Sequence, residues 1–260
     1  MDHSGADPRT RFSSRVDAYV KARPQYPPGV IHDLVRTIGF DRGWRVVDVG
    51  SGTGISSALF LANGNPVTAV EPNAAMRHAA EQSLRAFADF RSVDGSAEAT
   101  GLPDACCDLI VCAQAFHWFD INAARAEFLR ILRPGGHALL MWNDRKLTDT
   151  PFLEAYERLL IEFGTDYLKV RHNNIDAAKL AAFFGPAGYE TTTLPNAQRL
   201  DYAGLEARLR SSSYTPGEDD PRYAPMIRRL RGLFDQWQQA GYVTIAYDTT
   251  LFRGRLAPDT

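Results

Sequence analysis

Short apolar runs alternate with amphipathic stretches from about residue 30 to residue 143. Such runs predict buried strands, and the spacing between them predicts helices, so the pattern is typical of a mostly parallel sheet with helices on both faces. The predicted strands are Arg45–Val49, Pro66–Val70, Asp89–Val93, Leu109–Ala113 and His137–Trp142. The predicted helices are Ile55–Ala62, Ala74–Ala88 and Ala123–Leu132.

The pattern changes after residue 143. Residues 144–188 and 201–241 predict two helical insertions that form a cap, and between them Tyr189–Leu200 predicts a strand. A last strand at Tyr242–Arg253, within residues 242–255, would complete a seven-stranded sheet. Residues 1–30 carry aromatic and basic residues and predict a helix and an extended segment that could act as a lid. We therefore expect one α/β domain over residues 1–260, with its core at 31–143.

Composition narrows the classes of protein. The net charge of -2 argues against a protein that tracks nucleic acid by bulk electrostatics. The sequence from Met1 to Thr10 is polar, and no apolar stretch is long enough to span a membrane, so we expect a cytoplasmic protein. Cys106, Cys107 and Cys112 have no partners at zinc-ligand spacing, which predicts reduced thiols and no metal site. The sequence leaves the oligomeric state open.

A glycine-rich turn joins the first predicted strand to the first predicted helix. Its sequence is Asp48-Val49-Gly50-Ser51-Gly52-Thr53-Gly54. Alternating glycines let the backbone turn sharply and approach a ligand closely, and the helix that follows offers free N–H groups to a carboxylate or phosphate. Proteins that bind dinucleotides use a similar turn, so the motif alone also permits an NAD-dependent oxidoreductase.

Two further features favour a different nucleoside. The third glycine of the dinucleotide fingerprint would fall on Ile55, whereas this chain has it one position earlier, at Gly54. Glu71 ends the second predicted strand, where its carboxylate can accept hydrogen bonds from both hydroxyls of a ribose. Together these features predict nucleoside binding beside the turn.

At this point the sequence resembles the class I S-adenosylmethionine-dependent methyltransferases. The glycine-rich turn looks like their first motif, and Glu71-Pro72 with Met76 looks like their ribose-binding motif. Further matches are Gly95-Ser96-Ala97-Glu98, the segment from Asp108 through Gln114-Ala115-Phe116-His117-Trp118, and Arg130-Ile131-Leu132-Arg133-Pro134-Gly135-Gly136. Phe12-Ser13, Tyr19, Arg23-Pro24, Tyr26-Pro27 and His117-Trp118 resemble a subgroup that includes trans-aconitate methyltransferases, which methylate a carboxylate.

The resemblance implies a Rossmann-like fold, S-adenosylmethionine as cofactor and a small-molecule substrate. The residues that it assigns to the cofactor are Asp48, Gly50, Ser51, Gly52, Thr53, Gly54, Glu71, Pro72, Met76, Ser96, Ala97, Glu98, Gln114, Ala115, Phe116 and Arg23. The candidates for substrate contact are Tyr19, Tyr26, Trp118, Trp142, Asn143, His172, Ser213 and Tyr214. Many relatives have Asp where this chain has Ser96, so Ser96, the backbone of Ala97 or Asp94 would have to receive the adenine amino group.

The acceptor is inferred from the residues directly after the fourth strand. Gln114-Ala115-Phe116-His117 stands where enzymes that methylate amide or nucleobase nitrogen place an Asn/Asp-Pro-Pro-Tyr-like run, which favours methylation of oxygen. His117 is the candidate general base, although a carboxylate acceptor would need none. Methylation of nitrogen, sulfur or carbon, and a non-catalytic cofactor-binding protein, are the alternatives. Helical spacing predicts a solvated face for Arg208, Arg210, Arg222, Arg228, Arg229 and Arg231.

Overall fold

The apolar runs of the first half of the chain form alternating strands and helices. The computed structural model describes residues 23–170 and 176–256. The elements up to the fourth strand are α3 (Gly29–Ile38), β1 (Val46–Val49), α4 (Ile55–Asn63), β2 (Val67–Val70), α5 (Ala74–Leu84), β3 (Phe90–Val93) and β4 (Cys107–Ala113). They are followed by a short 3₁₀ helix, η2 (Phe116–Trp118), and by α6 (Ile121–Ile131) and β5 (Leu132–Arg145).

The second half contributes mostly helices and two long strands. Its elements are α7 (Pro151–Phe163), α8 (Tyr167–Val170), α9 (Ala177–Phe184), η3 (Gly185–Ala187), β6 (Glu190–Leu200), α10 (Tyr202–Arg210), α11 (Tyr223–Trp237) and β7 (Val243–Arg255). The two predicted helical insertions are thus present, one after β5 and one after β6.

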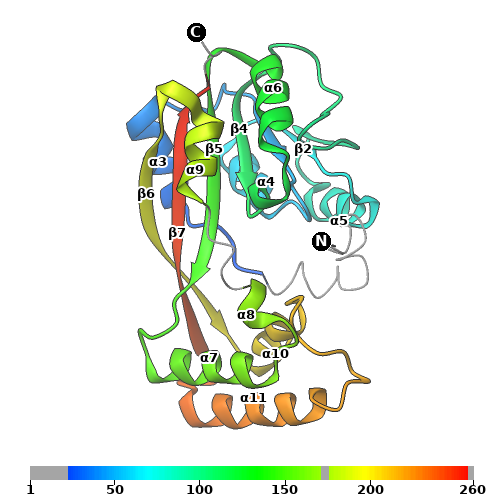
Figure 1. Ribbon diagram of the computed structural model, residues 1–260, viewed down its shortest axis with the longest axis vertical. Coiled ribbons are helices and arrows are strands. Elements are labelled where there is room, and N and C mark those ends of the chain that lie inside the picture. Colours follow the sequence, from blue (N-terminus) through cyan, green and yellow to red (C-terminus); the bar gives the residue numbers. More distant parts are fainter. Residues whose placement is uncertain (1–22, 171–175, 257–260) are drawn as a thin grey trace.

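All seven strands belong to one sheet, in the order β3-β2-β1-β4-β5-β7-β6. The first five strands pair in parallel, and β7 runs antiparallel to both of its neighbours. Central β1 is buried along its whole length because it pairs on both sides and helices cover both faces. This arrangement confirms the predicted Rossmann-like, mostly parallel sheet (Figure 1).

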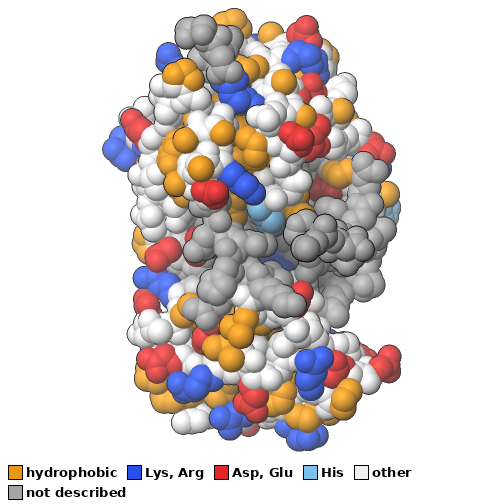
Figure 2. All heavy atoms as spheres, in the orientation of Figure 1, with side chains coloured by type: hydrophobic (Ala, Val, Ile, Leu, Met, Phe, Trp, Pro, Cys, Tyr) orange, Lys and Arg blue, Asp and Glu red, His pale blue; other side chains and the backbone are white. Residues whose placement is uncertain are grey.

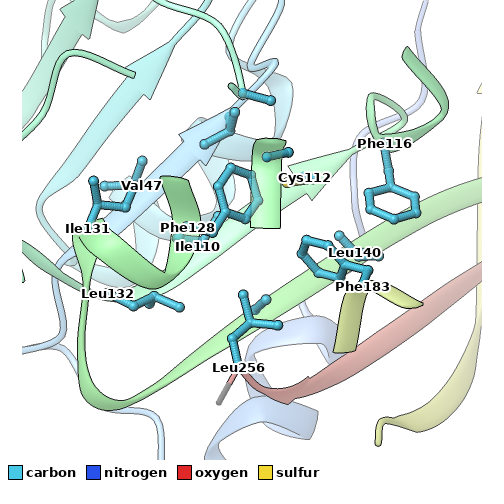
Figure 3. Packing of buried hydrophobic residues seen from close by; sticks show 14 of the residues in the cluster. Val47, Ile110, Cys112, Phe116, Phe128, Ile131, Leu132, Leu140, Phe183 and Leu256 are labelled. Carbon is cyan, nitrogen blue, oxygen red and sulfur yellow. The ribbon is translucent and has the colours of Figure 1, made fainter. Parts of the chain in front are cut away.

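The two faces of the sheet bury alternate residues of the same strands, because successive side chains of a strand point to opposite faces. On one face, Ile110, Cys112 and Leu140 pack with Phe128 of α6 and Phe183 of α9 (Figure 3). On the other face, the neighbouring positions of β4 and β5 pack against α3 and α4. Helix α9 therefore covers the sheet, so the first insertion supplies only α7 and α8 to the cap.

Strand β5 is longer than the predicted His137–Trp142. It extends through Asn143, Asp144 and Arg145, whose polar side chains obscure the apolar pattern of a buried strand. Pairing with β7 maintains the extended backbone up to the pair Arg145 and Tyr247. The long strand carries the chain from the core into the cap, which lies beyond the carboxyl ends of the parallel strands (Figure 1).

The cap has a core of its own. Helices α7, α10 and α11 pack around the first half of β7, through residues such as Leu160, Leu205, Leu230 and Ile245. In Figure 1 the outer helices α7 and α11 lie side by side at the far end of the molecule, and α8 and α10 lie on the side of the core. None of the helices within residues 23–170 and 176–256 is long and apolar enough to cross a bilayer.

Part of the predicted lid is visible. Tyr26, a candidate for closing over the site, is only 7% exposed and packs with Val30 and Leu34 of α3 in the core. Its contact with the substrate stays a prediction. The other lid tyrosine, Tyr19, and His172 lie outside the described residues.

Candidate active site

The glycine turn between β1 and α4 has a backbone that requires glycine. Gly50, Gly52 and Gly54 have φ of 68, 55 and 82°, in the left-handed region that side chains disfavour. A Cβ atom at Gly50 would lie 2.6 Å from the Cβ of Ala115, and one at Gly54 would lie 2.7 Å from Leu84. The turn is therefore held close to the loop after β4 on one side and to α5 on the other.

The Glu71 carboxylate lies against this turn, as predicted. One of its oxygens accepts a hydrogen bond from the Gly52 N–H and the other accepts one from the Asn73 N–H, both at 2.9 Å. The side chain is 8% exposed, and burial raises the pKa of Glu71. Each oxygen keeps a second lone pair for a ligand hydroxyl.

Asp48, at the end of β1, is fully buried beneath the turn. Its Oδ2 accepts hydrogen bonds of 2.6 Å from the hydroxyls of Ser56 and Ser57, in the first turn of α4. Burial raises the pKa of Asp48 to about 6, against the lowering effect of these two hydroxyls. The contact of Asp48 with the helix was missed from the sequence, although two serines directly after the glycine motif were a usable signal.

Three buried side-chain oxygens near the turn have no hydrogen-bond partner among the described residues. Asp48 Oδ1, Ser51 Oγ and Thr53 Oγ1 make no hydrogen bond to any part of the chain that the structure describes. Buried polar atoms are nearly always hydrogen-bonded in native proteins, so their grouping along one turn fits a polar ligand. Residues able to hold a nucleoside thus surround the turn. The described residues contain no group of three or more His, Cys, Asp or Glu side chains suited to a metal ion.

The predicted adenine-binding turn follows β3. The N–H groups of Ser96 and Ala99 each donate to the other residue's carbonyl, at 3.1 and 3.3 Å. Arg77 donates to both carboxylate oxygens of Asp94, at 3.1 and 3.0 Å. Each Asp94 oxygen keeps a second lone pair, so Asp94, Ser96 and the backbone of Ala97 all stay candidates to accept a hydrogen bond from the adenine amino group.

The loop after β4 completes the binding edge of the sheet. Gln114 has a φ of 58°, rare for a residue with a side chain, and such strain is concentrated at functional sites. Its backbone N–H donates to the Met141 carbonyl, and its side-chain Nε2 donates to the Asn143 carbonyl at 3.2 Å. Ala115 then lies against Gly50. The ends of β1, β2, β4 and β5 therefore meet at one edge, where open α/β sheets bind ligands.

Comparison with known proteins agrees with this geometry. The family model of the methyltransferase domain matches residues 47–140. An uncharacterized methyltransferase of Mycobacterium tuberculosis is 37% identical over 56% of this chain and 57% of its own length, so the chain spans little more than half of that relative. A ubiquinone/menaquinone biosynthesis C-methyltransferase of Rubrivivax gelatinosus is 33% identical over 61% of this chain and 67% of its own.

The chain belongs to the class I S-adenosylmethionine-dependent methyltransferases. A solved structure from Anaeromyxobacter dehalogenans, named as a type II methyltransferase, has the same fold with a TM-score of 0.62. It covers 91% of this chain and 99% of its own, at 22% sequence identity.

Two aromatic residues predicted to contact ligands of this methyltransferase have their rings in the core. Phe116 is 1% exposed and packs edge to face with Phe183, their ring centroids 4.9 Å apart. Trp142 is 6% exposed and packs against Phe116 and Phe252. These rings pack in the core on one face of the sheet. Contact of either ring with a ligand stays a prediction.

His117 and Trp118 lie in η2, directly after the loop that contacts Gly50. His117 is half-buried, Trp118 is 41% exposed, and their ring centroids are 4.8 Å apart. Contact of Trp118 with the substrate and the catalytic role of His117 stay predictions.

Other residues predicted to contact ligands make contacts within the fold. Asn143 Oδ1 accepts hydrogen bonds from Asn196 Nδ2 and Thr249 Oγ1, at 3.1 and 2.5 Å, which joins β5 to β6 and β7. Arg23 Nη2 donates to the Ser211 carbonyl at 3.1 Å, and its contact with a carboxylate of the cofactor or the substrate stays a prediction. Tyr214 and Ser213 are half-buried, and the Tyr214 ring packs against that of Tyr167.

Buried charges in the cap were missed from the sequence. Arg145 forms an ion pair with Glu157, and each side chain is 10% exposed. Arg208 is 7% exposed, which contradicts the solvated face predicted for it. Helical spacing carried the signal, since Arg208 lies on the same side of α10 as the buried Leu205 and Leu209. The solvated prediction is confirmed for Arg210, Arg222, Arg228, Arg229 and Arg231, all of which are exposed.

Proposed function

We propose that this chain binds S-adenosylmethionine at the carboxyl ends of β1, β2 and β4 and methylates an oxygen atom of a small molecule, in particular a carboxylate. The observation that carries the cofactor proposal is the contact of the Glu71 carboxylate with the glycine turn, beside buried oxygens that have no partner in the described part of the chain. Membership of the methyltransferase family supports the same cofactor.

Each group at the edge has a role in this proposal. The Glu71 oxygens accept hydrogen bonds from the two ribose hydroxyls, and Ser51 and Thr53 offer hydroxyls to the polar part of the cofactor. One of the three candidate groups directly after β3 receives the adenine amino group. The bound cofactor supplies an electrophilic methyl group. The protein's main task is to orient the acceptor, and orientation can contribute about 7–11 kcal/mol to lowering a barrier.

The acceptor atom is proposed from the residues around the loop after β4. This loop lacks the run typical of enzymes that methylate amide or nucleobase nitrogen. A carboxylate is ionised at neutral pH, so its methylation needs no proton removed and leaves His117 a positioning group rather than a base. The second candidate is a carbon acceptor, because the relative in Rubrivivax gelatinosus is named as a C-methyltransferase.

Calorimetric titration tests the cofactor proposal. S-adenosylmethionine and its demethylated product should each bind to one saturable site. Glu71→Ala should weaken binding about 100-fold, because two hydrogen bonds to a charged group are lost. Glu81→Ala, an exposed glutamate on α5, is the matched control and should bind like the wild type. Absence of binding by both ligands would refute the proposal.

Transfer of a radiolabelled methyl group into fractionated metabolites tests the acceptor. A methyl ester is hydrolysed by mild base and releases its label as volatile methanol, whereas carbon-, nitrogen- and sulfur-linked methyl groups keep it. Base-labile product supports the carboxylate, and a base-stable product contradicts it. If the cofactor binds and no acceptor is labelled, the chain is a non-catalytic cofactor-binding protein.

A further inference from the structure

The cap buries two arginines in different electrostatic surroundings. Arg145, at the end of β5, donates to Glu157 and to the Tyr167 hydroxyl, and that hydroxyl donates in turn to Glu157 at 2.5 Å. Its guanidinium also lies 5.2 Å from the centre of the Tyr156 ring. The positive charge of Arg145 is therefore balanced within the fold by the carboxylate of Glu157.

Arg208 has no such balance. Its Nε donates to the Tyr247 hydroxyl at 3.3 Å, and its Nη1 donates to the Ser212 hydroxyl at 3.0 Å. Within the described ranges no carboxylate pairs with it, and its Nη2 makes no hydrogen bond. The Tyr247 hydroxyl is itself held in place, because it donates to Gln198 Oε1 at 2.8 Å.

A buried guanidinium of this kind needs an anion. Arginine stays protonated in proteins, so it cannot avoid the cost of burial by losing its charge, as lysine or histidine can. The other electrostatic neighbours of Arg208 are Tyr156 and Tyr214. Burial raises the pKa of Tyr156, so that phenol stays neutral and cannot compensate the charge. Burying a charge without an opposite charge costs free energy, and a bound anion beside Arg208 would offset that cost.

The position of Arg208 links it to the acceptor side of the edge. Tyr247, its hydrogen-bond partner, pairs across the sheet with Arg145, two residues beyond Asn143. The Asn143 carbonyl accepts a hydrogen bond from Gln114, in the loop after β4. A continuous series of contacts thus runs from the loop at the proposed site of methyl transfer into the cap, where α10 lies on the side of the core (Figure 1).

We propose that Arg208, positioned by the hydroxyls of Tyr247 and Ser212 that accept its hydrogen bonds, uses its guanidinium to bind an oxyanion of the methyl acceptor at a position away from the atom that is methylated. This inference rests on the proposed function. The bound group differs from the methylated one, because methylation would remove the negative charge that Arg208 binds, and pairing with a guanidinium would weaken a carboxylate as a nucleophile. The acceptor class is therefore a small acid with a second acidic group, a carboxylate or a phosphate.

Thermal unfolding tests whether an oxyanion binds, without a measurement of enzyme activity. Wild-type protein saturated with the demethylated cofactor is heated with succinate, tricarballylate or inorganic phosphate, and with chloride at equal ionic strength. We expect one of the three oxyanions to raise the midpoint by about 3 °C or more above chloride. A response to the carboxylates or to phosphate distinguishes the two sources of the oxyanion. No response to any of them, in protein that binds the cofactor, overturns the inference.

Variants of Arg208 and of a neighbouring arginine test whether the oxyanion that raises the midpoint binds at Arg208. Arg208→Met should weaken binding of the oxyanion that stabilises the wild type by at least about 30-fold, because a buried charged donor is removed. Arg210→Met, two positions along α10, removes an exposed arginine and should keep the wild-type response. Arg208→Lys keeps the charge but loses the planar fork, and we expect it to bind about tenfold more weakly than the wild type. An equal response in all four proteins places the anion elsewhere and overturns the assignment.

The test separates this inference from the proposed function. Failure of the cofactor to bind would contradict the proposed function, and the anion response of cofactor-free protein would then decide the assignment to Arg208 alone. A normal cofactor titration with no oxyanion effect would contradict only the assignment to Arg208. If Arg208→Met does not fold, Arg208→Lys and the wild-type response still decide the outcome.

Discussion

The edge of the parallel sheet and the cap beyond it bury charges of opposite sign. At the edge, Asp48 and Glu71 are acidic, and within the described ranges their carboxylates accept hydrogen bonds from hydroxyl and backbone N–H groups, with the charge of Arg77 near Glu71. In the cap, Arg208 is basic and has only hydroxyl partners among the residues described. The outside of the cap differs again, because acidic and basic side chains are interspersed there (Figure 2).

This difference in charge leads us to expect that the two regions bind different ligands. Acidic groups at the edge suit a ligand that carries hydroxyls and a positive charge, as S-adenosylmethionine does. A basic group in the cap suits an anionic acceptor. Each region would then bind the partner whose charge it lacks, and methyl transfer would take place between them. This interpretation requires that the unbalanced buried charges bind ligands and do not stabilise the fold. Measurements of stability in variants test this requirement.

The largest effect is expected at the balanced arginine. Arg145→Met should lower the free energy of unfolding by about 3–5 kcal/mol, because Glu157 loses its guanidinium partner in a buried position. Arg208→Met should change it by about 1 kcal/mol or less, since no carboxylate is left behind. Urea unfolding monitored by circular dichroism measures both.

The control for this comparison is Glu157→Gln combined with Arg145→Met, which should recover part of the loss because both charges are gone. If Arg208→Met were as destabilising as Arg145→Met, Arg208 would be a structural residue, and the contrast between balanced and unbalanced charge would fail.

The next effect concerns Asp48 at the edge. Its pKa of about 6 lies above the ordinary 3.8, so the folded protein holds a proton that the unfolded chain releases. The stabilisation by this proton is complete below pH 3.8 and is lost as the pH rises through about 6. Relative to Asp48→Asn, the wild type should therefore lose up to about 3 kcal/mol of unfolding free energy across this window.

Denaturant unfolding of both proteins at a series of pH values gives this difference. The asparagine side chain of the variant cannot titrate, so subtraction removes the contributions of the other acidic groups. A difference that is constant with pH would mean that Asp48 is not the buried titrating group. Bound cofactor should reduce the pH dependence, because its positive charge favours the ionised carboxylate.

The edge was predictable from sequence because its requirements are local. A left-handed backbone needs glycine, so Gly50, Gly52 and Gly54 mark the turn in the sequence itself. Glu71 was placed correctly because it ends an apolar run that becomes β2. Adjacent strands of a parallel sheet then bring both to one edge.

The cap was less predictable because its contacts join residues far apart in the sequence. Arg208 is bound by Tyr247, on a strand that begins after α11, and nothing near Arg208 in the chain indicates this partner. Residue type alone also misled, since arginines on a helix are usually exposed. The length of β5 was underestimated for the same reason, because pairing with β7, not apolar character, maintains it through Arg145.

A smaller effect is expected at the glycine turn, within the edge. Gly50→Ala should destabilise the protein by about 1–3 kcal/mol, because the new Cβ atom would overlap with Ala115 in a left-handed backbone. Binding of the demethylated cofactor should weaken as the turn moves. Gly232→Ala, a helical glycine with open space around it, is the control and should stabilise the protein slightly. Equal stability of the Gly50 variant and the wild type would contradict the close approach of the turn to the β4 loop.

The smallest effect distinguishes a base from a positioning group. With a carboxylate acceptor no proton is removed, so His117→Gln should lower kcat by less than about tenfold and leave the pH profile of kcat/KM unchanged between about pH 6 and 9. Its half-buried ring lies against Trp118, and glutamine keeps much of that volume and polarity. Loss of a basic limb in the pH profile would identify His117 as a base. That outcome would favour a phenol, amine or carbon acid as the acceptor atom in place of the proposed carboxylate.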